Sequence, residues 1–76
     1  MSEISKAINR FFKEATRPEI VEIDNKTNFT DHLYKVYKMY YIEHKDINYI
    51  KDVTNCSRGK IEADLRLIRK QLWKLI

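Results

Sequence analysis

Cationic and aromatic side chains are interleaved with apolar ones near the C-terminal end of the sequence. On a helix, at about 100° per residue, one flank and the outer face carry Arg66, Arg69, Lys70, Trp73 and Lys74. Guanidinium and ammonium groups neutralise phosphates, and an indole stacks on an unpaired base at roughly 1–3 kcal/mol per base. The pattern predicts contact with nucleic acid. The alternative is a solvated face whose charges suit the C-terminal helix dipole, with Trp73 against the core edge.

The start of the same segment, SRGK, offers a second phosphate contact. Backbone N–H groups at a helix N-terminus bind anions, Gly59 leaves room for close approach, and Arg58 and Lys60 add positive charge. A nucleotide-hydrolysing P-loop is not indicated, because the rest of the GxxxxGK pattern is missing. Ser57 itself is better explained as a plain helix cap.

Tyrosines and lysines are also mixed in the stretch YKVYKMYYIEHK. On a helix, four of them form a strip on which tyrosines stack bases and lysines follow a nucleic-acid backbone. The predicted strip consists of Tyr34, Lys38, Tyr41 and Lys45. Tyr37 and Tyr40 are instead predicted to be structural, at the rim of the core.

No set of residues indicates catalysis or a metal site. His32, His44 and Cys56 lack the close Cys/His pairs of a zinc site. No Ser/His/Asp or Cys/His arrangement of a nucleophile and its base stands out either. Asp52, Glu62 and Asp64 are expected to balance nearby Lys and Arg. We therefore expect a protein that is not an enzyme and has no catalytic residues, no metal and no cofactor.

Positive charge is concentrated in the second half of the chain. Residues 1–31 hold five Lys/Arg and six Asp/Glu, a net charge of −1, whereas residues 32–76 hold ten and five, a net charge of +5. This asymmetry favours attraction to a polyanion such as nucleic acid, although basic residues also serve solubility. Without a secretory signal or an apolar run of roughly 18 residues, we expect a cytoplasmic protein with no membrane contact.

The apolar pattern predicts one all-α domain over residues 1–76. A single cysteine allows no intrachain disulfide, and so short a chain has one small, dynamic core. The compact bundle is predicted to contain four helices, at about 3–15, 29–44, 47–53 and 58–75. Pro18 is expected to end the first helix near Thr16. Residues 18–28 are predicted to be irregular, with a helical turn or a short extended piece at Ile20, Val21 and Ile23 as the alternatives. Asp46 and Ser57 are the predicted caps of the last two helices.

Two of these helices have a clear core face. Apolar residues at spacings of 4, 3, 4 and 3 form a seam along the last helix, and three more share a face of the third. The seam is Ile61, Leu65, Ile68, Leu72 and Leu75, and the shorter face is Ile47, Ile50 and Val53. A coiled-coil dimer through the seam is the alternative, but two heptads are short for one, so we expect a monomer.

The segment DINYIKDVTNCSRGKIEADLRLIRKQL resembles a helix-turn-helix, with two apolar-faced helices joined by the turn TNCS. In that family the second helix enters the major groove of DNA and its early polar residues meet the bases. The resemblance implies that Arg58, Lys60, Glu62 and Asp64 face DNA.

The chain as a whole resembles the small helical proteins that accompany the UvsW helicase of T-even phages. The likeness lies in the four-helix layout, the content of Lys, Ile, Asn and Tyr, and the basic ending RLIRKQLWKLI. It implies a dynamic fold similar to the HRDC domain, the structure-specific nucleic-acid-binding module of RecQ-type helicases. It also implies a role beside a helicase or another replication and repair protein, in the cytoplasm of an infected cell.

Both resemblances agree on nucleic acid. We therefore expect a non-catalytic accessory module that binds single-stranded or branched DNA by its structure, through phosphate contacts that carry no sequence information. A helix-turn-helix regulator of duplex DNA and a protein-interaction module anchored by Trp73 are the alternatives.

Overall fold

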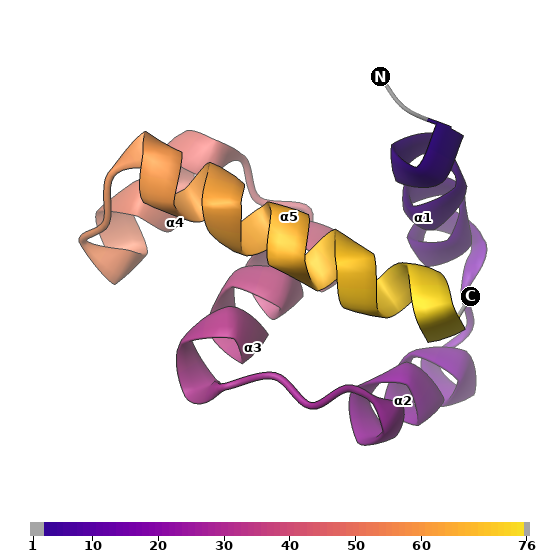
Figure 1. The fold of residues 1–76 in the computed structure, drawn as a ribbon. Coiled ribbons are helices and arrows are strands. Elements are labelled where there is room, and N and C mark those ends of the chain that lie inside the picture. The colour runs from indigo at the N-terminus through magenta and orange to yellow at the C-terminus, as the bar shows by residue number, and fades with distance from the viewer. Residues whose placement is uncertain (1–2, 76) are drawn as a thin grey trace.

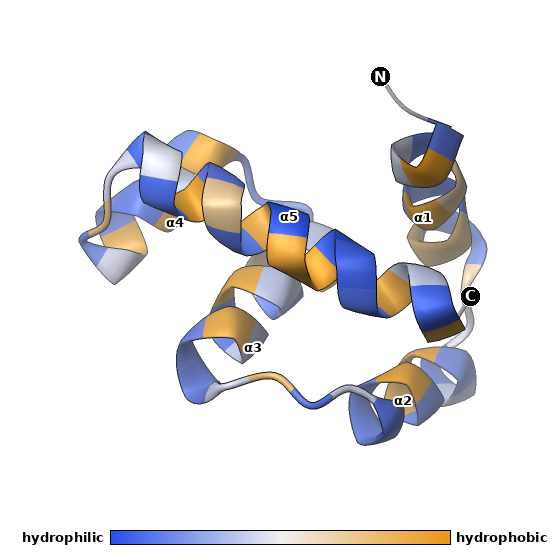
Figure 2. Cartoon of the chain, in the orientation of Figure 1, coloured by the Kyte–Doolittle hydropathy of each residue, from blue (hydrophilic) through white to orange (hydrophobic). Residues whose placement is uncertain are grey.

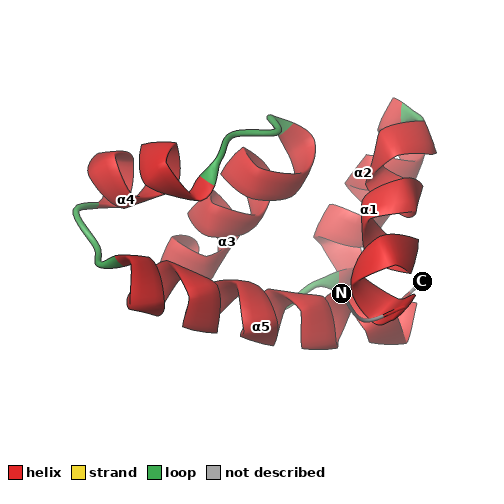
Figure 3. Cartoon of the chain, turned by 90° about the horizontal axis from the view of Figure 1, so that it is seen from above, coloured by secondary structure: helices red, strands yellow, loops and turns green. Residues whose placement is uncertain are grey.

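Residues 3–75 are described in the computed structural model, and they form helices joined by short connections (Figures 1 and 3). The elements are α1 (Glu3–Glu14), α2 (Arg17–Lys26), α3 (Asp31–Tyr37), the π-helical turn η1 (Lys38–Ile42), α4 (Ile47–Thr54) and α5 (Arg58–Leu75). The all-α class is confirmed. The helix count changes from the predicted four to five, because the segment predicted to be irregular contains α2.

The helix α2 begins with a local signal in the sequence TRPE. The Thr16 backbone N–H donates to Glu19 Oε1 at 3.0 Å, and the Thr16 hydroxyl donates to the same oxygen at 2.9 Å. The backbone hydrogen bond is the main reason that the pKa of Glu19 is lowered. Pro18 lies in the first turn, where a missing N–H costs nothing. The prediction of irregular structure is therefore wrong over residues 18–26, while residues 27 and 28 are irregular as predicted.

The predicted helix 29–44 is shorter and ends in a π-helical turn. Its start is set by Thr30, whose hydroxyl accepts the Leu33 backbone N–H at 3.3 Å. At its end, the Glu43 N–H donates to the Lys38 carbonyl at 2.9 Å, five residues back. His44 then has a left-handed backbone with φ of 57°, which turns the chain out of the helix.

The cap predictions for the last two helices are confirmed. Asp46 Oδ1 accepts the Tyr49 N–H at 2.8 Å at the start of α4, and Ser57 Oγ accepts the Lys60 N–H at 3.2 Å at the start of α5. Of the three core positions predicted for α4, Ile50 is buried and Ile47 is partly buried. Val53 is 57% exposed, so that position is wrong.

Helix α5 crosses the whole molecule, and the other four α-helices contact it (Figure 1). Bands of hydrophobic and hydrophilic residues alternate along it (Figure 2), as expected of a helix with one buried side. Four seam residues are buried, namely Ile61, Leu65, Ile68 and Leu72. Leu75, at the end of the seam, remains partly exposed. Within residues 3–75, no helix combines the length and apolar character needed to cross a membrane.

An aromatic cluster joins α1 to the α3–η1 helix. Phe12 packs edge-on against Tyr37, with 5.8 Å between ring centroids, and against Tyr41 at 5.2 Å. Tyr37 is fully buried, and its hydroxyl donates to Asp24 Oδ1 of α2 at 2.7 Å. The cluster fixes the position of the α3–η1 helix relative to α1.

Candidate nucleic-acid interface

Five residues of α5 form what we call the cationic face: Arg66, Arg69, Lys70, Trp73 and Lys74. Arg66, Lys70 and Lys74 are exposed, and Trp73 is 47% exposed. No carboxylate in the described part of the chain forms an ion pair with these three cations. Four of the five residues, Arg66, Lys70, Trp73 and Lys74, therefore lie on one exposed, positively charged surface.

Arg69 has a different environment at the edge of the cationic face. It is partly buried and lies beside the hydroxyl of Tyr41. Burial raises the pKa of Tyr41 to about 12, while the charge and hydrogen bond of Arg69 act in the opposite direction. Tyr41 is only 3% exposed, so its ring is held in the core and cannot stack on a base. The prediction that Tyr41 binds nucleic acid through its ring is wrong.

The two cations at the start of α5 are engaged with acidic residues one turn later. Arg58 Nε lies 3.0 Å from Glu62 Oε1, and Lys60 Nζ lies 2.8 Å from Asp64 Oδ1. Since Ser57 also occupies the Lys60 N–H, the segment SRGK is not an open anion site. The predicted roles of Arg58 and Lys60 as free phosphate ligands are not supported by these contacts.

Asp64 is a buried carboxylate that links α5 to α3. It is 1% exposed, and His32 Nε2 lies 2.6 Å from its Oδ2. Burial alone would raise the pKa of Asp64, but the hydrogen bonds from Lys60 and His32 outweigh it and lower that pKa. Because Asp64 is covered, the position that the helix-turn-helix resemblance assigns to it, facing DNA, is wrong.

The strip predicted from Tyr34, Lys38, Tyr41 and Lys45 does not form. Lys38 lines a groove between the α3–η1 helix and α4, together with Lys35. The hydroxyl of Tyr34 donates to Asp24 of α2 at 3.3 Å, and Lys45 Nζ lies 5.0 Å from the ring centroid of Tyr49. The regular helix assumed for the strip ends in a π-helical turn, so these side chains diverge.

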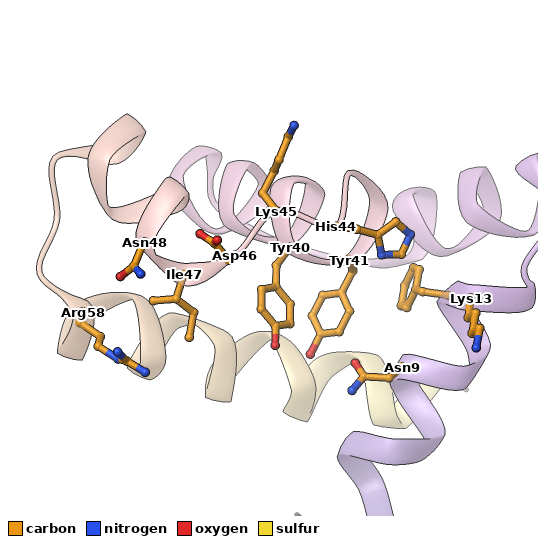
Figure 4. Close-up of a pocket in the computed structure, with 11 residues that line it drawn as sticks. Asn9, Lys13, Tyr40, Tyr41, His44, Lys45, Asp46, Ile47, Asn48 and Arg58 are labelled. Carbon is orange, nitrogen blue, oxygen red and sulfur yellow. The ribbon is translucent and has the colours of Figure 1, made fainter.

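A groove that the sequence did not reveal lies between α1, η1 and the start of α4 (Figure 4). Its volume is about 750 Å³. We call it the tyrosine groove, and its lining residues are Asn9, Phe12, Lys13, Tyr40, Tyr41, His44, Lys45, Asp46, Ile47, Asn48 and Arg58. Tyr40, predicted to be structural, is a partly buried lining residue, while Tyr37 is structural as predicted. No single stretch of sequence contains this set, because α1, η1, α4, the start of α5 and the loop before α4 all contribute to it.

The charged side chains that line the tyrosine groove are Lys13, Lys45, Arg58 and Asp46. Because Arg58 is paired with Glu62 and Lys45 extends away from the groove, Lys13 is the cation available to a ligand. The Asp46 carboxylate is occupied by the Tyr49 N–H. Arg69 beside the Tyr41 hydroxyl connects this groove to the cationic face.

Among residues 3–75, no three side chains of His, Cys, Asp or Glu are grouped so that they could hold a metal ion. Comparison of the chain with protein-family models, with curated proteins and with solved structures gives no significant match. The function is therefore inferred from the residues and the geometry.

Proposed function

We propose that this chain is a non-catalytic nucleic-acid-binding module that contacts phosphates through the cationic face of α5. One observation carries the proposal. Arg66, Lys70 and Lys74 are exposed without acidic partners among residues 3–75, beside a half-exposed Trp73. Elsewhere on the same helix, Arg58 and Lys60 are neutralised by ion pairs. The cationic face is therefore the part of α5 that retains uncompensated charge.

The same geometry favours recognition of nucleic-acid structure over sequence. Phosphate contacts position a protein without reading bases, and an exposed indole stacks on any unpaired base. Single-stranded or branched DNA offers phosphates and unpaired bases together. An accessory role beside a recombination or repair helicase is part of this proposal, and it rests on the resemblance to the proteins that accompany the UvsW helicase.

Fluorescence anisotropy with labelled single-stranded, forked and duplex DNA tests the proposal. We expect salt-sensitive binding by the wild type, and a large loss when Arg66, Lys70 and Lys74 are all changed to Gln. For single strands each lost phosphate contact removes about 0.7 from the slope of log affinity against log salt, so the slope should fall by about 2. Arg69 is left unchanged because it also supports Tyr41.

A matched variant controls for net charge. Changing Lys35, Lys38 and Lys51 to Gln removes the same three charges from α3, η1 and α4, and it should leave most of the affinity intact. Lys38 was itself a predicted contact, so this variant also tests that prediction. Equal losses in the two variants would show that the cationic face has no special role, and absence of binding at low salt would refute the proposed function.

A protein-binding surface is the second candidate. Trp73 and Leu75 are both partly exposed near the end of α5, and Trp with Arg dominates the energetics of many interfaces. This alternative predicts a partner that stays bound after nuclease treatment and is lost on changing Trp73 to Ala. Duplex recognition in the manner of a helix-turn-helix is disfavoured, because the buried Asp64 cannot reach a base.

A further inference from the structure

The tyrosine groove has the lining expected of a site for part of a DNA strand. We propose that it holds one unpaired nucleotide, so that the protein binds single-stranded DNA more tightly than duplex DNA. This inference rests on the proposed function and adds a second contact region to the cationic face. The strand would pass from the cationic face into the groove near Arg69, whose charge acts on the Tyr41 hydroxyl.

The π-helical turn η1 supplies the aromatic surface of the groove. Tyr40 and Tyr41 are adjacent in sequence, yet both line it, with ring centroids 5.0 Å apart and planes at 81°. Figure 4 shows the two rings side by side, with their hydroxyls directed toward α5. A turn with i→i+5 bonds holds an extra residue, so successive side chains diverge less than in an α-helix, and such turns often occur at functional sites.

The two tyrosines have different roles. Tyr41 is buried and forms part of the groove wall, whereas Tyr40 is only partly buried and can present its ring to a base. Stacking of a base on an aromatic ring tolerates any sequence. Tyr40 is therefore the residue that we assign to the nucleobase.

Positive charge at the groove suits the phosphate that accompanies the base. Lys13 projects from α1 at one end, and Arg58 lies at the other end on α5 (Figure 4). Lys13 is exposed and has no ion-pair partner in the described chain. Arg58 shares its charge with Glu62, and Lys45 extends away from the groove. Lys13 is thus the main cation available to a bound phosphate.

The groove is large enough to admit a nucleotide. Its volume of about 750 Å³ lies within the range of roughly 300–1,000 Å³ that is usual for small-ligand sites. A base in a duplex must be unstacked and unpaired before it can enter, which costs free energy, whereas a base in a single strand is already available. The groove therefore confers a preference for single strands that the open cationic face does not.

The test compares Tyr40→Leu with Tyr40→Phe in the full-length chain. A short fluorescein-labelled oligothymidylate and a duplex of equal length serve as probes, and circular dichroism checks that helicity is retained. We expect Tyr40→Leu to raise the Kd for the single strand at least about tenfold, because stacking is lost, and to change the duplex Kd little. Tyr40→Phe keeps the ring and should bind like the wild type.

Lys13→Gln is a second variant on the exposed side of α1, where it does not disturb the core. It should weaken single-strand binding and reduce its salt dependence, again with little effect on duplex. If both variants bind single strands as the wild type does, the groove proposal is overturned while the cationic face stands. If the wild type binds neither probe, the proposed function fails and the groove proposal fails with it.

Discussion

At the scale of single residues, the ion pairs of α5 distinguish cations that are available from cations that are not. Arg58 and Lys60 each have an acidic residue four positions later, and both pairs form. Arg66 has Lys70 four positions later and Glu62 four positions earlier, but Glu62 pairs with Arg58, so Arg66 has no ion-pair partner among residues 3–75. The expectation that acidic residues balance nearby basic ones is confirmed for Glu62 and Asp64. It is not confirmed for Asp52, which forms no ion pair in the described part of the chain. The same i,i+4 spacing could have removed Arg58 and Lys60 from the predicted set of free contacts.

The burial of Tyr41 could not be predicted from the spacing of residues within one helix. The placement of Tyr41 in the core depends on its contact with Phe12 of α1 at 5.2 Å between ring centroids. That contact joins residues far apart in the chain, and helical periodicity carries no information about it. The pairing of His32 with Asp64 is equally nonlocal, which is why neither residue was predicted to face the other.

Asp64 gives a prediction about acid stability. Changing Asp64 to Asn should lower the free energy of unfolding at pH 7, because a buried carboxylate that binds both Lys60 and His32 is lost. Burial tends to raise the pKa of Asp64, but these hydrogen bonds lower it below the ordinary 3.8. The stabilisation is therefore full above the unfolded pKa and is lost as the pH falls through the folded pKa.

Urea unfolding at a series of pH values measures this effect. The difference in stability between wild type and the Asp64→Asn variant should be constant near neutrality and shrink in acid. A difference that stays the same down to the lowest pH at which the protein folds would mean that ionisation of Asp64 does not stabilise the fold.

At the scale of elements, the start of α2 could have been predicted from the local sequence alone. The sequence TRPE contains a helix cap and a proline suited to a first turn, and both are used. The end of the α3–η1 helix is different. Its π-helical turn depends on aromatic packing against α1, and the residues Lys38–Ile42 alone look like a continuing α-helix. The tyrosine groove was missed for that reason.

Besides the buried Ile23, a partly buried hydrogen bond from Tyr37 attaches α2 to the core. Changing Tyr37 to Phe removes the 2.7 Å bond to Asp24, and should lower the free energy of unfolding by about 1.5–3 kcal/mol, as is usual for bonds to charged groups. Hydrogen exchange of the α2 amides should accelerate most. Urea unfolding and exchange monitored by NMR measure the two effects.

Tyr34→Phe is the matched control. The Tyr34 hydroxyl also donates to Asp24, but at 3.3 Å and on the surface, so its loss should change stability by no more than about 0.5 kcal/mol. Equal effects of the two substitutions would argue against a special role for the buried bond.

At the scale of the whole molecule, α5 both organises the core and carries the cationic face. Its seam side is buried against the other helices, which leaves only the outer side for a ligand. This division was predictable from the sequence, because it depends on the spacing of residues within one helix. The relation of α5 to the tyrosine groove was not, because it depends on how α1, η1 and α4 assemble around that helix.

The overall charge distribution also indicates that the outer side of α5 is the one available to an anionic ligand. The second half of the chain carries the net charge of +5, against −1 for residues 1–31. Two of the cations in that half, Arg58 and Lys60, are neutralised locally, so the remaining field is weighted toward the outer side of α5. A polyanion approaching the protein should be drawn to this side, and more strongly at low salt.

The most direct measurement of the central claim is an NMR titration of the isotope-labelled protein with a short oligothymidylate at low salt. We expect large shift changes on the backbone of Arg66, Lys70 and Lys74 and on the indole N–H of Trp73, together with changes at Tyr40 if the tyrosine groove is also occupied. Residues of α2 and of the groove between α3 and α4 should change little. Shift changes centred on those other surfaces, or none at all at saturating oligonucleotide, would contradict the claim that α5 presents a nucleic-acid-binding face.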